Sequence, residues 1–212
     1  MFAGGTAPVF AAVLPRCSRK ARGTLRRGAD GTANSGGLSY PAGILCGMTD
    51  LFTERWPHHS ALEMLRFWAA GDFGPPPHAA AAGLLITGAP EPGVLELRWD
   101  PPAHLANPAG IVHGGYTSLV CDDAAGLAAA SLGERFQPPL TLDLHVSFVR
   151  PAHIGRSYTA KGTVAHAGGQ RVIADAQIFD DRQRLVARAH GTFATQRHGD
   201  PARPGFTLPG PR

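Results

Sequence analysis

Residues 113–133, HGGYTSLVCDDAAGLAAASLG, decide the fold of this chain. Alanine, the strongest helix former, recurs through the segment, so the sequence predicts a helix from Gly114 to Leu132 that ends at Gly133. The segment is apolar on most of its faces, which is typical of a buried helix. We therefore expect a central helix that the other elements surround.

Strand candidates lie on both sides of this helix in the sequence. Before it, residues 83–88 and 94–99 are short β-like runs joined by a proline- and glycine-containing loop, which predicts a hairpin. After it, apolar and polar residues alternate over 140–148 with a period close to two. Three further candidates are residues 157–165, 170–179 and 184–195. One helix among several mostly antiparallel strands favours an α+β domain whose sheet wraps the helix.

A short amphipathic helix is predicted before the hairpin, over residues 60–70. Ser60 and Glu63 have the spacing of a capping box at its start. Gly71 ends it, and the prolines at 75–77 prevent its continuation. Its expected inward stripe consists of Leu62, Leu65, Trp68 and Ala69.

The basic charge of the chain is concentrated near its N-terminus. The formal net charge is +4, and residues 1–47 contain six basic residues and one acid, or +5, which leaves 4 − 5 = −1 for the remainder. A near-neutral body without a basic stripe argues against a nucleic-acid-binding domain. The sequence has no apolar run of about 18 residues, so we expect no membrane span.

The composition divides the chain into a folded domain over residues 48–196 and two tails. Residues 1–47 are rich in Gly, Ala, Arg and Ser, and three interpretations remain open: disorder, a targeting segment, or an extension from a start codon placed too far upstream of Met48. Residues 197–212 contain four prolines and are expected to form a flexible tail. The three cysteines have neither metal-ligand spacing nor a disulfide pattern, which favours a cytoplasmic protein.

The segment that leads into the central helix, NPAGIVHGG at 107–115, is a candidate binding site. Its glycines allow close approach of a ligand and leave the first N–H groups of the helix uncovered. Those groups and the positive end of the helix dipole favour a developing negative charge such as an oxyanion. The alternative is that HGG only forms a tight entry turn.

Two adjacent acids, Asp122 and Asp123, interrupt the apolar helix. Neighbouring helical positions are about 100° apart, so we expect the two acids to lie on different faces, with at least one pointing into a site or an interface. The alternative is an exposed polar strip that includes Ser118. Asp122 and Gly114 are eight residues apart, or about 12 Å along the helix axis, so they cannot both contact one carbonyl group. If both act on one carbonyl, a symmetric dimer with antiparallel helices must supply one of them.

From Ser60 to Thr195 the chain resembles the PaaI-like (phenylacetate-pathway type) hotdog-fold acyl-CoA thioesterases. The resemblance rests on the short N-terminal helix and on four segments: NPAGIVHGG at 107–115, LVCDDAAG at 119–126, LTLDLHVSFVRPA at 140–152 and LVARAHGTF at 185–193. The combination of HGG, an Asp nine residues after the His, and V-x-F-x-R-P-A at 146–152 is its most specific part.

The resemblance implies a sheet wrapped round a central helix, dimers or dimers of dimers (homotetramers), and hydrolysis of acyl-CoA thioesters without a metal or cofactor. The catalytic residues implied by position are Asp122, Gly114, Asn107, His113 and Thr141. Asp122 would attack the thioester or activate water, and the Gly114 N–H would polarise the carbonyl. Asn107 and His113 would place the substrate, and Thr141 would orient water. The resemblance gives Asp123 no role.

Substrate-binding candidates flank these positions. Gly115 and Tyr116 follow His113 and could border the acyl group, although core packing is the alternative for Tyr116. Arg150 and Arg171, together with Arg156, could meet the phosphates of CoA, because guanidinium groups match phosphate geometry; a structural role is the alternative for Arg150. Neither HxxxH nor HExxH occurs, so we expect no metal site. Two other functions remain open: a non-catalytic acyl-CoA binding or sensing protein, and an enoyl-CoA hydratase.

Overall fold

The computed structural model describes residues 58–168 and 171–194. The predictions for the tails, residues 1–47 and 197–212, lie outside the described residues, as do the first ten residues of the predicted domain. Within the described ranges, none of the helices combines the length and apolar character needed to cross a membrane.

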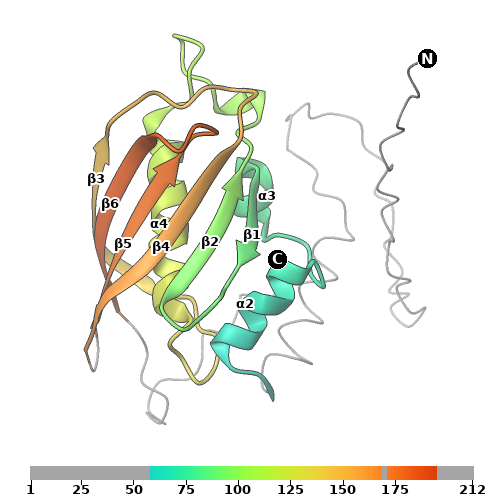
Figure 1. The fold of residues 1–212 in the computed structure, drawn as a ribbon, viewed down its shortest axis with the longest axis vertical. Helices are drawn as coiled ribbons and strands as arrows, with labels where there is room; N and C mark the ends of the chain where they lie inside the picture. Colours follow the sequence, from blue (N-terminus) through green and yellow to red (C-terminus); the bar gives the residue numbers. More distant parts are fainter. Residues whose placement is uncertain (1–57, 169–170, 195–212) are drawn as a thin grey trace, which may run out of the picture. The chain divides into compact units, whose positions relative to one another are not determined.

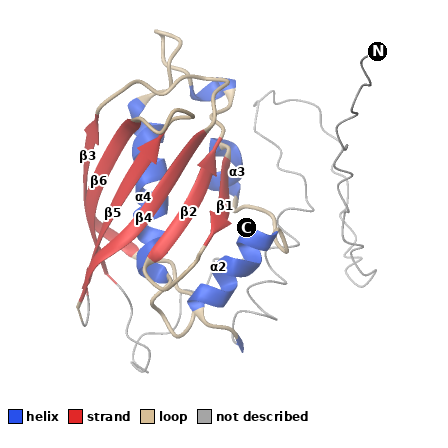
Figure 2. Cartoon of the chain, in the orientation of Figure 1, coloured by secondary structure: helices blue, strands red, loops and turns tan. Residues whose placement is uncertain are grey.

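A six-stranded antiparallel sheet packs against one long helix, α4 (Gly114–Ala130), as Figures 1 and 2 show. The strands are β1 (Leu84–Gly88), β2 (Val94–Trp99), β3 (Leu140–Phe148), β4 (Tyr158–Ala167), β5 (Arg171–Phe179) and β6 (Leu185–Ala194). Their order in the sheet is β1-β2-β4-β5-β6-β3, and every neighbouring pair is antiparallel. The predicted α+β architecture, with a sheet around a central helix, is confirmed.

Helix α4 is the centre of the hydrophobic core. It contacts β2, β3, β4, β5 and β6, and its buried residues are Thr117, Val120, Cys121, Ala124, Ala125, Gly126, Ala128, Ala129 and Ala130. The small side chains allow the helix backbone to approach the sheet closely. At Gly162 in β4, a Cβ atom would lie only 1.9 Å from the carbonyl oxygen of Ala124. Only glycine fits at this point of contact between backbone and backbone.

The N-terminal helix α2 (Ala61–Ala70) begins and ends as predicted. Ser60 and Glu63 form the capping box, and Gly71 ends the helix in the left-handed region with a φ of 82°. The buried face differs from the predicted stripe and consists of Ala61, Met64, Leu65 and Trp68. Leu62 and Ala69 are only half-buried, whereas the buried ring of Trp68 packs edge-on against Phe136.

A second short helix, α3 (Pro77–Ala82), follows where the sequence predicted only a break. Pro77 occupies the first helical turn, where a missing N–H costs nothing, and the alanines after it favour a helix. Gly83 ends the helix with a φ of 74°. A single turn of 3₁₀ helix, η3 (Ala103–Leu105), lies in the loop before α4.

Strand β3 was predicted correctly as a strand but differs in its burial. It forms the last strand at one edge of the sheet. A bulge at Leu142, between Thr141 and Asp143, interrupts its alternation of side chains. Leu140 is 67% exposed and Phe148 is 58% exposed, and Leu142 is exposed as well, whereas Leu144 and Val146 pack against the core. Uncovered apolar residues on an unpaired edge are typical of an interface.

The contact between Gly162 and α4 generates a stability prediction. Gly162→Ala forces α4 away from β4, and we expect a loss of about 3 kcal/mol or more in the free energy of unfolding, as for severe overpacking of a core. The matched control is Gly74→Ala, since a Cβ at Gly74 meets nothing within 4 Å. Urea unfolding of the two variants measures the difference, and equal midpoints would contradict the proposed packing constraint.

Candidate active site

A cavity of about 690 Å³ lies beside α4 and contains Asp122. Its walls come from α2, α3, β1, β2, β3 and the loop after α4, and they are mainly apolar. The apolar lining includes Trp68, Phe73, Leu84, Ile86, Leu97, Leu127 and Phe136. The polar and charged side chains that line it are Thr87, Thr141, His78, Arg98, Asp122 and Asp123. The cavity can thus hold an acyl-sized apolar group next to a carboxylate.

Asp122 is half-buried in this cavity and is bound by Thr141. The Thr141 hydroxyl donates to Oδ1 of Asp122 at 2.8 Å. Thr141 is paired with Phe193 in the sheet register, and paired residues point to the same face of the sheet. Because Phe193 is fully buried against α4, the Thr141 side chain also points towards α4 and can reach Asp122. Burial raises the pKa of Asp122 above its ordinary value, the Thr141 hydrogen bond opposes the rise, and the negative charge of Asp123 adds to it.

Asp123 lines the same cavity as Asp122, although the two residues are neighbours on the helix and lie about 100° apart around its axis. The cavity extends around enough of the helix circumference to include two positions about 100° apart. Asp123 pairs with His78 of α3, with 3.3 Å between Oδ2 and Nε2. Hydrogen bonding to Asp123 raises the pKa of His78 above its ordinary value. His78 was not predicted as a site residue, because α3 was not predicted and no sequence motif includes this histidine.

The N-terminus of α4 presents an available backbone donor. Nδ1 of His113 accepts a hydrogen bond from the Gly115 N–H at 3.0 Å, so His113 caps the helix and Gly115 has no free donor. The Gly114 N–H has no acceptor within residues 58–168 and 171–194. A Cβ at Gly114 would touch only the Phe148 ring, at 3.4 Å. Tyr116 is 37% exposed and packs edge-on against His113 rather than in the core.

Asn107 shapes the loop that leads to this donor. Its Oδ1 accepts hydrogen bonds from the backbone N–H groups of Ala109 and Ile111, at 2.9 and 3.4 Å. Ile111 then bridges to His153 in the connection between β3 and β4. Within one chain, Asn107 therefore holds the loop that presents His113 and Gly114.

The structure separates the predicted catalytic residues into two groups within one chain. Asp122 and Thr141 line the cavity, whereas Asn107, His113 and Gly114 do not. Figure 1 shows the start of α4 at the same end of the sheet as the β3–β4 connection, and the helix then runs towards the opposite end. Because α4 is continuous from Gly114 to Ala130, the eight residues between Gly114 and Asp122 correspond to about 12 Å along the helix axis.

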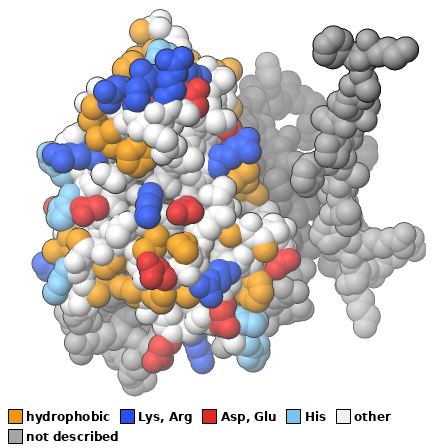
Figure 3. Space-filling view, viewed as in Figure 1, with side chains coloured by type: hydrophobic (Ala, Val, Ile, Leu, Met, Phe, Trp, Pro, Cys, Tyr) orange, Lys and Arg blue, Asp and Glu red, His pale blue; other side chains and the backbone are white. Residues whose placement is uncertain are grey.

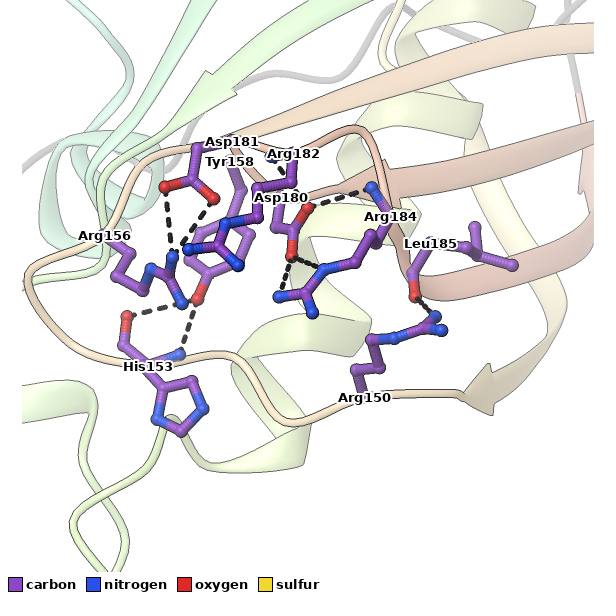
Figure 4. Close-up of polar contacts among 9 residues, drawn as sticks. All are labelled: Arg150, His153, Arg156, Tyr158, Asp180, Asp181, Arg182, Arg184 and Leu185. Atoms are coloured by element: carbon purple, nitrogen blue, oxygen red, sulfur yellow. Dashed lines mark hydrogen bonds and ion pairs between the residues drawn. The ribbon is translucent and has the colours of Figure 1, made fainter.

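A cluster of arginines lies beside the loop that precedes α4 (Figure 4). Arg150 donates to the Leu185 carbonyl oxygen at 2.5 Å, which supports the structural alternative for this residue. Arg156 donates to both carboxylate oxygens of Asp181 at 3.1 Å. Arg184 pairs with Asp180 at 2.7 Å. In the space-filling view, Lys and Arg side chains gather at this end of the sheet (Figure 3).

The turn between β5 and β6 holds this cluster in place. Asp180 accepts hydrogen bonds from the backbone N–H groups of Arg182 and Arg184. The hydrogen bond from the backbone N–H of Arg184 contributes most to lowering the pKa of Asp180, which falls to about 2. Arg171 does not belong to the cluster, since it begins β5 and lies about 27 Å from the far end of that strand. The predicted pair of CoA-binding residues, Arg150 and Arg171, is therefore not brought together within one chain.

Comparisons with known proteins find similarity to thioesterases and esterases. Residues 109–187 match the family model described as the thioesterase superfamily. A protein of Saccharolobus solfataricus, named as a candidate esterase, is 28% identical over 107 residues, which cover 50% of this chain and 70% of that protein. A similarly named protein of Pseudomonas aeruginosa is 33% identical over 87 residues, which cover 41% of this chain and 64% of that protein, just under two thirds.

A solved structure extends the likeness beyond residues 109–187, to 62% of this chain. It is a phenylacetic acid degradation-related protein of Ralstonia eutropha, described as a candidate thioesterase. Its sequence is 26% identical and its TM-score is 0.56, and the match covers 62% of this chain and 98% of that one. In its match over residues 109–187 and in its antiparallel sheet around a central helix, the chain is similar to the thioesterase superfamily and to PaaI-like hotdog-fold proteins.

Proposed function

We propose that the protein hydrolyses acyl-CoA thioesters at sites shared between two copies of the chain. The observation that carries the proposal is Asp122, a half-buried carboxylate held by Thr141 at the wall of a mainly apolar cavity of about 690 Å³. The match to the thioesterase superfamily supports the class of reaction. The cavity would take the acyl group, and Asp122 would lie next to the thioester carbon.

The reaction consumes one water molecule and releases a carboxylic acid and the thiol of CoA. In its ionised form, Asp122 either attacks the thioester carbon or removes a proton from the attacking water. Negative charge then develops on the carbonyl oxygen, and the Gly114 N–H at the positive end of a helix stabilises it. The C–S bond breaks, and the sulfur leaves as a thiolate that takes up a proton.

Strand β3 provides a geometry in which Asp122 and Gly114 meet. Thr141, near the start of β3, binds Asp122, and Phe148, at its end, lies against Gly114. Antiparallel pairing of β3 with the β3 of a second copy brings the start of one strand to the end of the other. Each Asp122 then faces the Gly114 end of the other chain, and the exposed Leu140 and Phe148 become covered.

The arginine cluster is the proposed binding site for the phosphates of CoA. Arg156, Arg182 and Arg184 lie at the same end of the sheet as Gly114. A CoA molecule whose thioester carbonyl is at Gly114 would reach this cluster with its phosphates and extend its acyl group into the cavity of the other copy. Arg171 lies too far from this cluster to act with it in the same chain. A dimer of dimers and a cytoplasmic location stay predictions.

The role of Asp122 is tested with Asp122→Asn. Because the amide can neither attack the thioester nor accept a proton, we expect thiol release from acyl-CoA to fall by about 10² to 10⁴-fold, with the oligomeric state unchanged. Glu91→Gln is the control, because it replaces a carboxylate by an amide in the exposed β1–β2 turn. A panel of aryl, short, medium and long acyl-CoAs, followed by free-thiol detection, measures both variants. Full turnover by Asp122→Asn, or tight acyl-CoA binding by the parent protein without thiol release, contradicts the proposal.

The shared site is tested with Gly114→Pro. Proline removes the Gly114 N–H and is compatible with the first position of a helix, and His113 already has the extended conformation that a following proline requires. We expect a loss of about 10² to 10³-fold in kcat, as for removal of one oxyanion donor. Gly114→Ala keeps the N–H and serves as the control.

Hybrid dimers of one Asp122→Asn chain and one Gly114→Pro chain extend this test. If each site takes Asp122 from one chain and Gly114 from the other, the hybrid contains one intact site and recovers about half of the parent activity. Differently tagged chains allow the hybrid to be purified and assayed. If both groups act within one chain, no intact site exists and the hybrid is as inactive as its two components.

A further inference from the structure

The cavity that holds Asp122 contains a second polar pair, His78 and Asp123. Nε2 of His78 lies 3.3 Å from Oδ2 of Asp123, and the two side chains are 53% and 19% exposed. His78 comes from α3 and Asp123 from α4, so the pair joins a wall of the cavity to the central helix. Neither residue takes part in the steps of the proposed hydrolysis.

Asp122 is in an environment that disfavours its charge. Burial raises the pKa of Asp122, and the neighbouring Asp123 carboxylate raises it further. A carboxylate that is to attack or to accept a proton must be ionised. The favourable effects on the ionised form come from the Thr141 hydrogen bond and from the positive charge of His78, which lowers the pKa of Asp122.

Among the described residues, no other side chain that lines the cavity can replace the positive charge of His78 near Asp122. Arg98 of β2 lines it too, but its guanidinium pairs with Asp100 at 2.6 Å. Burial raises the pKa of Cys121, adjacent to Asp122 on α4, to about 12, so its thiol remains neutral. The lining residues of α2, β1, β3 and the loop after α4 carry no Asp, Glu, His, Lys or Arg side chain within the described residues.

We propose that His78, held by Asp123, is a positioning residue that keeps Asp122 in its ionised form as the pH falls. The inference rests on the proposed function, because it assigns Asp122 the reacting role. Asp123 supports the imidazolium through the 3.3 Å contact, and the imidazolium in turn offsets the repulsion between the two adjacent carboxylates. The adjacent acids thus form one unit, in which Asp123 contributes through His78 rather than by contact with substrate.

The experiment is the pH dependence of kcat, from pH 4.5 to 9, for the parent protein, His78→Gln and His78→Lys. Thiol release is detected with a pyridyl disulfide reagent that remains reactive in acid. Without the cation, Asp122 is protonated at higher pH, so we expect His78→Gln to lose about twofold to fivefold in kcat on the acid side, and this loss to shrink as the pH rises. His78→Lys keeps a positive charge, so we expect its kcat at low pH to equal that of the parent protein.

His190→Gln is the matched control. His190 is also an exposed histidine paired with an aspartate, at 2.7 Å from Asp175, but it does not line the cavity, so its pH profile should equal that of the parent. A loss in His78→Gln that is the same at every pH would indicate a merely structural role and would overturn the inference. The inference is also overturned if kcat at low pH is the same in His78→Gln as in the parent protein, or if His78→Lys does not recover the kcat that His78→Gln loses at low pH.

A direct titration separates this inference from the proposed function. Carbon-13 NMR of the Asp122 carboxyl group, in the parent and in His78→Gln, reports its pKa without any turnover. If no acyl-CoA is hydrolysed but the pKa of Asp122 rises in His78→Gln, the proposed function fails and the electrostatic coupling stands. If hydrolysis depends on Asp122 but its pKa is the same in both proteins, the proposed function stands and the coupling is wrong.

Discussion

Direct backbone contact between helix α4 and strand β4 is the constraint on which the rest of the structure depends. At Gly162 the sheet approaches the Ala124 carbonyl group so closely that no side chain fits between them. The alanine-rich face of α4 makes this approach possible, and it fixes the helix in position and rotation against five strands. Asp122 and Gly114 are both carried on this one rigid helix, so their separation cannot change by local movement.

This fixed separation connects the fold to the proposed dimer. One chain offers a carboxylate at the wall of an apolar cavity and, at the start of the same helix, an N–H that has no acceptor among the described residues. Two such half-sites complement each other only when two helices run in opposite directions. The uncovered apolar residues of β3 lie at the sheet edge where that arrangement would form, and the same strand contacts Asp122 through Thr141 and Gly114 through Phe148. The strand that would join two copies is thus the strand that lines both half-sites.

Much of this fold follows from the sequence because local signals agree with each other. The capping box at Ser60 and Glu63, the β1–β2 hairpin and the long alanine-rich helix all lie where propensity and spacing predict them. Helix α3 was missed because three prolines suggest a break, although proline is compatible with the first turn of a helix. The exposure of β3 was missed because alternation predicts a strand but does not distinguish a core face from an interface.

The site was only partly predictable for a related reason. Sequence spacing gave the separation of Asp122 and Gly114, because both lie on one helix. The arrangement of His78, Asp123 and Asp122 depends instead on how α3 packs against α4, which no local pattern encodes. Likewise, Arg150 and Arg171 share a residue type suited to phosphate, but the antiparallel course of β5 places Arg171 far from the cluster at Asp180. Tertiary contacts decide which charged groups meet.

The most direct measurement of the central claim is a crystal structure of the protein with a non-hydrolysable acyl-CoA analogue, such as the ketone in which a methylene group replaces the sulfur. We expect the acyl group to lie in the cavity beside Asp122 of one chain. We also expect the carbonyl oxygen to lie within hydrogen-bond distance of the Gly114 N–H of the other chain, about 2.7–3.2 Å. An analogue whose carbonyl group contacts Gly114 and Asp122 of the same chain, or neither of them, would contradict this expectation.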